Sequence, residues 1–170
     1  ICVFESLRAA GWYHNVDVNI KWIDAEELAS PTANISEIMH GCDGYVVPGG
    51  FGIRGIEGKI EAARYSRENE IPFLGLCLGM QVAVVEFARN VLGWKDADST
   101  EFNEKTEHPV IHIMEYQKTV MNKGGTMRLG AYPAKLKKGS RSYDAYKTGS
   151  ISERHRHRYE FNNQYRKDFE

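Results

Sequence analysis

The chain has few cysteines, few prolines and almost no net charge. Its 170 residues include three cysteines and five prolines, and the formal net charge is −1. The cysteines (Cys2, Cys42 and Cys77) lie far apart and form no Cys-x-x-Cys pair, which argues against a disulfide framework and a zinc site. We therefore expect reduced thiols, no metal and a cytoplasmic protein. The balanced charge gives no global field to recruit nucleic acid or an anionic membrane surface.

The chain also lacks a stretch that could span a membrane. Its longest apolar run, residues 73–85, is interrupted by glycines and Gln81 and is too short for a bilayer. Neither a signal-like segment nor an internal repeat is visible. A composition of 42% hydrophobic and 26% charged residues is that of a globular domain. We expect one domain over residues 1–170, truncated at both ends, because the chain opens inside a helical pattern and ends without a terminating element.

Strand and helix patterns alternate in the first half of the chain. Strand patterns cover residues 16–22, 44–48 and 71–76, and helical patterns cover 1–10, 25–28, 35–39, 58–69 and 79–90. Gly11 is expected to end the first helix as a C-cap. This order predicts an α/β fold with an open, mostly parallel sheet flanked by helices. Further strands are expected at residues 110–114, 126–131 and 152–161, between long polar loops.

The most informative stretch is an apolar segment that enters a Gly-x-Cys-x-Gly sequence and continues as a helix. Gly75, Cys77 and Gly79 have the spacing of a nucleophile elbow, a strand–turn–helix corner that leaves room only for glycine beside the nucleophile. A thiol at a helix N-terminus lies where the peptide dipoles favour the thiolate. The pattern therefore favours Cys77 as a catalytic nucleophile over a buried core cysteine, the commoner fate of a free thiol.

A second glycine-rich loop, residues 48–52, follows the strand before the elbow. Ligands of open α/β sheets bind beyond the carboxyl ends of the strands, where both loops are expected to lie. A thiolate that attacks a carbonyl needs donors for the developing oxyanion, and we assign this role to the N–H groups of Gly50 and Leu78. A plain turn is the alternative for residues 48–52. A phosphate cradle is disfavoured because no Gly-Lys-Ser/Thr ending follows.

Five segments carry a resemblance that runs over nearly the whole chain. They are VPGGFGIRGIEGKI (47–60), FLGLCLGMQVAVVEFARN (73–90), DADSTEF (96–102), GGTMRLG (124–130) and ERHRHRYEFNN (153–163). The chain resembles the glutaminase domain of the CTP synthase family, a branch of the class I, triad-type glutamine amidotransferases. The elbow alone indicates only the amidotransferase superfamily, whereas the last three segments point to this branch. The resemblance implies a flavodoxin-like, three-layer fold.

The resemblance also implies roles for single residues. Cys77 would attack the side-chain amide of L-glutamine to give a glutamyl thioester and ammonia. Glu101 would contact the α-amino group and Arg158 the α-carboxylate, a pairing that suits a free amino acid. The implied glutamine-binding residues are Gly50, Leu78, Gly79, Met80, Gln81, Glu101 and Arg158, of which Gly50 and Leu78 match the oxyanion donors.

Without the resemblance, Glu101 and Arg158 have ordinary interpretations. Glu101 on a polar loop would be a solvated charge. At strand period, Arg158 shares one face with Arg154, Arg156 and Glu160, and the opposite face carries His155, His157, Tyr159 and Phe161. A His-x-His metal pair lacks an obvious third ligand. A nucleic-acid patch is disfavoured because glutamates bracket the arginines.

One part of the family pattern is missing. The family completes its triad with a His-Pro-Glu segment, but this chain has no His-x-Glu sequence, and His108-Pro109 is followed by Val110. Loss of the imidazole as general acid and base costs about 10²–10⁴-fold in rate. We expect the triad His and Glu beyond Glu170, the alternative being an inactive glutaminase.

The resemblance implies a glutaminase that supplies ammonia for the ATP-dependent amination of UTP to CTP. It implies no cofactor in this domain, ATP and magnesium in a synthetase domain of the same polypeptide, GTP as an allosteric activator, and a homotetramer of the full-length enzyme. Two alternatives stay open. One is another class I amidotransferase or a γ-glutamyl hydrolase with the same thioester chemistry. The other is a non-catalytic, glutamine-sensing or scaffold domain.

Overall fold

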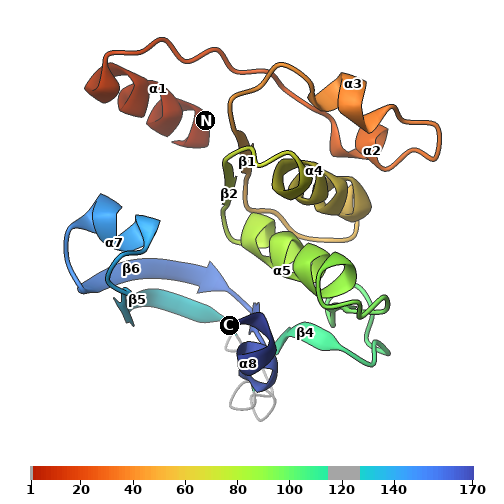
Figure 1. Ribbon diagram of the computed structural model, residues 1–170. Helices are drawn as coiled ribbons and strands as arrows, with labels where there is room; N and C mark the ends of the chain where they lie inside the picture. The colour runs from red at the N-terminus through yellow and green to blue at the C-terminus, as the bar shows by residue number, and fades with distance from the viewer. Residues whose placement is uncertain (1, 115–126) are drawn as a thin grey trace.

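The structure, a computed structural model, describes residues 2–114 and 127–170 (Figure 1). In chain order the elements are α1 (Cys2–His14), α2 (Ala25–Leu28), α3 (Ile35–Met39), β1 (Tyr45–Val47), α4 (Ile56–Glu68), β2 (Phe73–Gly75), α5 (Leu78–Asn90), β3 (Asp98–Ser99), β4 (Pro109–Ile113), β5 (Arg128–Lys135), α7 (Arg141–Tyr146), β6 (Ser150–His157), β7 (Tyr159–Phe161), a 3₁₀ turn (Asn163–Tyr165) and α8 (Arg166–Phe169). The described helices include none long and apolar enough to cross a bilayer. The strand expected at 126–131 begins at Arg128, and residues 124–126 of the GGTMRLG segment lie outside the described part.

The strands beside the elbow pair in parallel, and the strands farther along the chain form both parallel and antiparallel pairs. β1 and β2 pair in parallel, with Val46 opposite Leu74. β3 pairs in parallel with β4, which pairs antiparallel with β7. β5 and β6 form a separate antiparallel ladder that runs from Arg128 opposite His157 to Lys135 opposite Ser150. The predicted α/β class is therefore confirmed.

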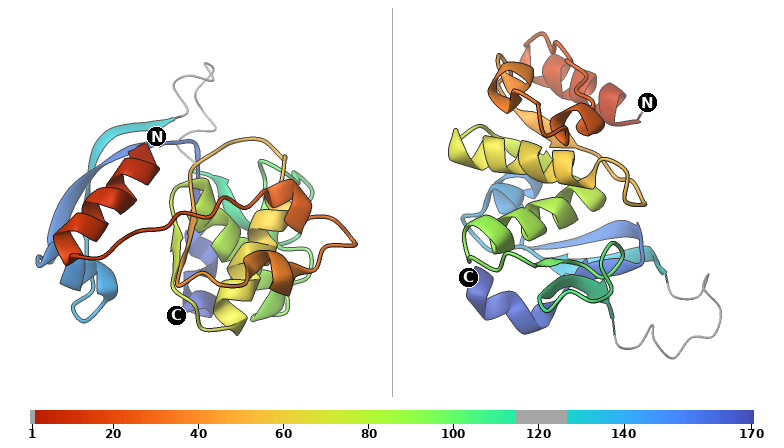
Figure 2. Two further views of the ribbon diagram at one scale, coloured as in Figure 1. Left: turned by 90° about the horizontal axis from the view of Figure 1, so that it is seen from above. Right: turned by 90° about the vertical axis from the view of Figure 1, so that its right-hand side faces the viewer.

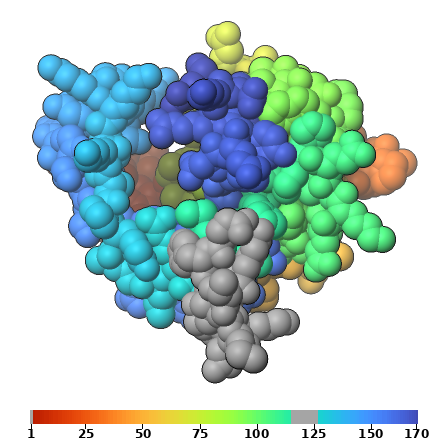
Figure 3. Space-filling view, turned by 90° about the horizontal axis from the view of Figure 1, so that it is seen from below, coloured from red at the N-terminus to blue at the C-terminus, as the bar shows by residue number. Residues whose placement is uncertain are grey.

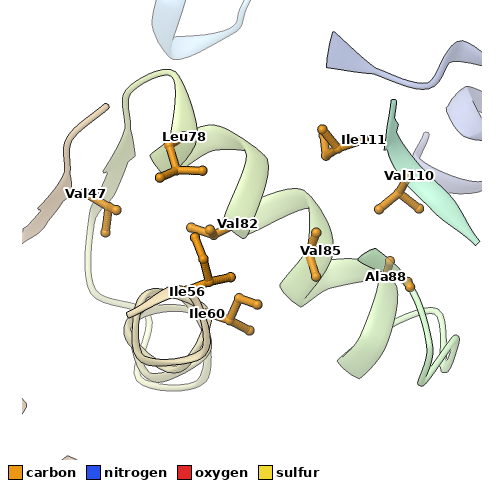
Figure 4. Close-up of a cluster of buried hydrophobic side chains, with 10 residues drawn as sticks. Val47, Ile56, Ile60, Leu78, Val82, Val85, Ala88, Val110 and Ile111 are labelled. Carbon is orange, nitrogen blue, oxygen red and sulfur yellow. The ribbon is translucent and has the colours of Figure 1, made fainter. Parts of the chain in front are cut away.

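Helix α5 is the centre of the packed core. Its buried residues Leu78, Val82, Val85 and Ala88 are spaced three or four apart and so share one helical face. Figure 4 shows this face between Ile56 and Ile60 of α4 on one side and Val110 and Ile111 of β4 on the other. Helices α4 and α5 lie side by side next to β1 and β2 (Figures 1 and 2). This packing fixes the start of α5, where Cys77 lies.

A second cluster joins the short helices α2 and α3 to α4. Leu28, Met39, Tyr45 and Ala62 are its buried members. The Tyr45 hydroxyl donates to the Met39 carbonyl, which satisfies a polar group inside the cluster. A Cβ at Gly58 of α4 would collide with the α2 backbone, so α2 and α4 cross at a point where only glycine fits.

Two local predictions for the N-terminal segment are wrong. Helix α1 does not end at Gly11, because Gly11 is buried inside it, where a Cβ would lie 2.6 Å from Val18 Cγ2. The helix ends instead in a Schellman motif: Asn15 has φ 54°, and Val16 N–H donates to Gly11 O at 2.9 Å. Residues 16–22 form no strand. Trp22 is 80% exposed. Alternating side chains do not make a strand unless a neighbouring strand accepts its hydrogen bonds.

Candidate active site

Cys77 lies at a strained corner between β2 and α5. Its backbone has φ 54° and ψ −105°, a conformation that non-glycine residues adopt rarely and that is concentrated at functional sites. At both flanking positions, any side chain larger than that of glycine would collide with a neighbouring backbone. A Cβ at Gly75 would lie 2.5 Å from the Gly79 carbonyl carbon, and a Cβ at Gly79 would collide with the Val47 carbonyl of β1. This is the geometry of the predicted nucleophile elbow.

The Cys77 thiol faces an open surface rather than the core. Cys77 is exposed. A Cβ at Gly49 would lie 3.3 Å from Cys77 Cβ and 3.9 Å from its Sγ, so the glycine-rich loop after β1 runs directly past the thiol. Leu76 N–H donates to Val47 O at 2.9 Å, which holds the two strand ends together.

The two predicted oxyanion donors lie beside each other at the elbow. A Cβ at Gly50 would lie 3.1 Å from Leu78 Cδ2. Leu78 is the first residue of α5, so its N–H has no acceptor inside the helix. In the described part of the chain, neither the Gly50 N–H nor the Leu78 N–H donates to another group. Two unsatisfied N–H groups next to a thiol are what a tetrahedral oxyanion requires.

The structure brings Glu101 to the same loop. Glu101 Oε1 accepts a 3.4 Å hydrogen bond from Gly52 N–H, so the carboxylate lies against the loop that carries Gly50. Its backbone is held by Ser99, which is fully buried and whose Oγ accepts from Glu101 N–H at 3.1 Å. Glu101 is thus half-buried and lies against this loop rather than standing free in solvent.

Arg158 lies where the chain passes from β6 to β7 and is half-buried. The two-residue alternation expected through this segment therefore ends at His157. The Tyr159 phenol beside Arg158 has a raised pKa, caused first by burial and next by the Glu101 carboxylate, while the Arg158 guanidinium acts in the opposite direction. Glu101 and Arg158, 57 residues apart in the printed sequence, consequently act on one phenol. An acidic and a basic group thus both lie near the Tyr159 phenol.

The remaining predicted residues lie in the first turn of α5. Gly79 packs against Val47, and Met80 is 40% exposed. Gln81 is buried, and its Nε2 donates to the Tyr159 carbonyl at 3.2 Å. Gln81 Oε1 is buried and has no hydrogen-bond partner within the described residues. The side chain of Gln81 is thus directed toward β7.

The imidazoles with described contacts are engaged away from Cys77. His108 Nδ1 contacts Asp96 Oδ1 at 2.6 Å, and His112 Nδ1 contacts Thr100 Oγ1 at 2.8 Å. His155 and His157 hydrogen-bond each other. Within residues 2–114 and 127–170, no imidazole hydrogen-bonds the Cys77 thiol.

An open groove lies away from the candidate site residues. Figure 3 shows a hollow in the surface beside α8, and a groove of about 710 Å³ is lined by Lys135, Leu136, Lys137, Arg166, Phe169 and Glu170. None of the candidate site residues lines this groove. Nor do the described residues hold any group of three or more His, Cys, Asp or Glu side chains placed to bind a metal ion.

Sequence reasoning missed three residues that shape the site. Gly49 lies against Cys77, Ser99 holds the Glu101 backbone, and the Tyr159 phenol is influenced by both charged groups. The glycine-rich composition of residues 48–52 carried a signal for Gly49. Ser99 and Tyr159 carried none, because their positions depend on how β3, β4 and β7 pair.

Comparisons with known proteins agree with this geometry. A family model described as glutamine amidotransferase class-I matches residues 2–170. The CTP synthase of Caldanaerobacter subterraneus subsp. tengcongensis is 60% identical over 166 residues, which are 98% of this chain and 30% of the relative. The CTP synthase of Bacillus subtilis is 55% identical over 170 residues, which are 100% of this chain and 31% of the relative. The chain thus spans less than a third of the length of these relatives.

A solved structure agrees as well. The Trypanosoma brucei CTPS glutaminase domain with bound acivicin has a TM-score of 0.90 and 44% sequence identity to this chain. The match covers 98% of this chain and 64% of that one. It confirms the predicted fold class, including the regions where the described strands are short.

Proposed function

Because the chain belongs to the class I glutamine amidotransferase family, we propose that it hydrolyses L-glutamine through a Cys77 thioester and supplies the ammonia to CTP synthesis. The observation that carries the proposal is the elbow itself. An exposed thiol lies at a strained helix start, beside two backbone N–H groups that have no acceptor among residues 2–114 and 127–170. Identities of 55–60% to CTP synthases favour that enzyme over other amidotransferases.

The chemistry follows from the placement of the thiol. Cys77 Sγ forms a bond to the side-chain carbonyl carbon of glutamine, and the carbonyl oxygen becomes an oxyanion that the Gly50 and Leu78 N–H groups stabilise. Collapse breaks the carbon–nitrogen bond and releases ammonia, which leaves a glutamyl thioester. Water then hydrolyses the thioester to glutamate and restores the thiol.

Glu101 and Arg158 provide recognition in this proposal. The carboxylate of Glu101 suits the α-ammonium of glutamine, and the guanidinium of Arg158 suits its α-carboxylate. A peptide-bound glutamine has neither charge, so the pair selects the free amino acid. Gly79 and Met80 complete the wall of the pocket in the first turn of α5.

The proposal assigns the remaining parts to residues outside this chain. A histidine and a glutamate beyond Glu170 would move the proton from the thiol to the departing ammonia. A synthetase domain of the same polypeptide would bind UTP, ATP and magnesium, with GTP as activator and a homotetrameric assembly. We place the enzyme in the cytoplasm, where Cys77 stays reduced.

The test uses the protein at its full encoded length. Cys77→Ala should abolish ammonia release from glutamine, while ammonium chloride should still support amination of UTP, because added ammonia bypasses the glutaminase. A diazoketone analogue of glutamine should label the wild type on Cys77, and glutamine should protect against labelling. Cys42→Ala is the matched control, since Cys42 is a half-buried thiol away from the elbow, and it should keep both activities.

The outcomes separate the alternatives. Glutamine hydrolysis without any CTP formed from UTP and ATP would indicate another amidotransferase or a γ-glutamyl hydrolase. No labelling of Cys77, together with unchanged function in Cys77→Ala, would indicate a non-catalytic, glutamine-sensing domain.

A further inference from the structure

Arg89 near the end of α5 joins three residues through its guanidinium group. Nε donates to the Ala97 carbonyl at 2.7 Å, and Nη1 donates to both carboxylate oxygens of Glu57 at 3.0 and 2.9 Å. Nη2 lies 3.3 Å from Asp98 Oδ2, and the Arg89 side chain is only 18% exposed. Each of the three guanidinium nitrogens thus contacts a different residue, which fixes the orientation of this planar group.

The contacts to Ala97 and Asp98 lead to Glu101. Ala97 is fully buried, and Asp98 begins β3. Asp98 Oδ1 accepts from Ser99 N–H at 2.8 Å, and Ser99 Oγ accepts from Glu101 N–H at 3.1 Å. β3 has only two residues and its register with β4 shifts between them, so the side-chain contacts supplement a short ladder. A continuous series of contacts therefore connects Arg89 to the Glu101 backbone.

The contact to Glu57 leads to the glycine-rich loop. Glu57 lies in the first turn of α4, and the loop enters this helix through its N-cap, Gly55, which has φ 66°. Within the loop, Gly52 N–H donates to Glu101 Oε1 at 3.4 Å. The two series of contacts therefore meet at this hydrogen bond and form a closed ring that begins and ends at Arg89.

The guanidinium also separates two carboxylates. The Asp98 side chain is 13% exposed, and Arg89 contacts it and Glu57 at the same time. Burial raises the pKa of Asp98 and the Glu57 charge raises it further, whereas the Ser99 N–H and the Arg89 charge act in the opposite direction. Removal of the guanidinium leaves these two like charges to repel each other, which loosens β3 from the start of α4.

The thiol is held by other contacts. The hydrogen bond from Leu76 N–H to Val47 O and the close backbone approach at Gly79 fix the elbow. Arg89 lies 12 residues beyond Cys77 in the printed sequence, about 18 Å along the helix axis. Loss of the guanidinium should therefore displace the segment after β3 without moving the thiol.

We propose that Arg89 is a positioning residue that holds Glu101 against the glycine-rich loop and thereby sets the affinity for the α-ammonium group of glutamine. The inference rests on the proposed function. It goes beyond that function because Arg89 lies at the far end of α5 from the nucleophile and acts on glutamine only through Glu101.

The experiment measures steady-state glutamine hydrolysis by the protein at its full encoded length. Arg89→Met keeps an unbranched side chain but removes the guanidinium, and should raise KM for glutamine about three- to ten-fold with kcat changed less than about two-fold. Asp98→Asn removes one of the two carboxylate contacts and should raise KM about two-fold or more. Arg67→Met is the matched control. In the described part of the chain, Arg67 pairs with Glu68 and Glu86, which do not belong to the ring, so this variant should lose stability but keep KM.

A double-mutant comparison distinguishes positioning from general damage. Glu101→Ala alone should raise KM more than about ten-fold, because a charge-assisted contact is lost. Adding Arg89→Met should raise KM less than about two-fold further, because there is no carboxylate left to position. If Arg89→Met has its full effect in the Glu101→Ala background, the inference is wrong. A fall in kcat at unchanged KM would also overturn it.

Folding is checked by thermal unfolding of each variant. If Arg89→Met fails to fold, Asp98→Asn carries the same expectation from another element, and failure of both to fold would overturn the inference in favour of a purely structural role. A wild type that does not hydrolyse glutamine through Cys77 would refute the proposed function instead. If the wild type hydrolyses glutamine and Arg89→Met keeps its KM, only the positioning role of Arg89 is refuted.

Discussion

The two sides of the proposed site are built by different means. We call the region around Cys77 the nucleophile side and the region around Glu101 and Arg158 the recognition side. On the nucleophile side, α4 approaches α2 so closely that glycine is required at Gly58, and the start of α5 approaches β1 and β2 so closely that glycine is required at Gly75 and Gly79. On the recognition side, side-chain hydrogen bonds such as that from Gln81 to Tyr159 join distant segments. Burial differs in the same way: α4 and α5 both carry several buried residues, whereas no described residue from 127 to 170 is buried. Close backbone contact thus fixes the position of Cys77, whereas side-chain hydrogen bonds connect the segments that carry Glu101 and Arg158.

The largest expected effect comes from a substitution that disrupts the close backbone packing between α5 and β1. Gly79→Ala places a Cβ against the Val47 carbonyl, where no side-chain rotation relieves the collision, and should destabilise the protein by about 3 kcal/mol. Urea unfolding measures this. Gly44→Ala is the control on the same sheet, because its Cβ would meet Pro72 O at 3.4 Å, and it should cost less than about 1 kcal/mol. Equal stabilities for the two variants would contradict the proposed difference between the two sides.

The second effect tests an ion pair inside the nucleophile side. Glu86 of α5 has a side chain only 3% exposed, and Arg67 of α4 contacts it at 2.8 Å. Arg67→Met leaves a buried carboxylate with Asn90 as its remaining described partner and should cost about 2 kcal/mol, less than for a fully buried pair because Arg67 is itself 36% exposed.

Arg64→Met is the matched control for the ion pair. Arg64 lies on the same helix and pairs with partly exposed Glu61 and Glu68, so its loss should cost about 0.5 kcal/mol or less. Chemical unfolding of the two variants gives the comparison. If Arg64→Met is as damaging as Arg67→Met, burial of Glu86 is not the cause.

The two sides also differ in how far the sequence predicted them. The elbow could be predicted because glycine spacing is itself the signature of close backbone approach. The predicted helices at 25–28 and 35–39 match α2 and α3, since apolar spacing and the Asp24 and Asn34 caps are local features. Local sequence patterns therefore predicted the elements of the nucleophile side almost completely.

The recognition side could not be predicted in this way. Arg158 differs from its arginine neighbours only because the chain leaves one sheet for another after His157, which depends on the pairing of β5 with β6 and of β7 with β4. The two-residue β3 was missed for the same reason, since its pairing with β4 defines it. Residues 16–22 give the opposite case: their side chains alternate as in a strand, but no described strand pairs with them, so no strand forms. Only the family resemblance selected Glu101 and Arg158.

A smaller effect concerns a polar group in the second cluster of the nucleophile side. Burial raises the pKa of Tyr45 to about 12. The folded state therefore keeps a proton that the unfolded chain loses near pH 10, so stability should fall as pH rises from about 10 toward 12. Tyr45→Phe should remove this alkaline loss and cost about 1 kcal/mol at neutral pH, because the Met39 carbonyl loses its donor. Unfolding at several pH values measures both, and an unchanged alkaline slope would exclude Tyr45 as its source.

The smallest expected effect concerns the hydrogen bond between His108 and Asp96, and it tests whether this polar network contributes to glutamine binding. His108 stacks on Trp94 with ring centroids 5.0 Å apart, and its hydrogen bond is the largest cause that lowers the pKa of Asp96. A carboxyl whose pKa is lowered by folding stabilises the protein above its unfolded pKa, near 4, and this stability is lost as pH falls through the folded value. His108→Phe keeps the stacked ring but removes the donor, so acid unfolding should become less steep below pH 4. KM for glutamine should not change, because this network holds the start of β4 rather than Arg158. A raised KM would mean that the proposed recognition of glutamine depends on the start of β4 as well as on Glu101 and Arg158.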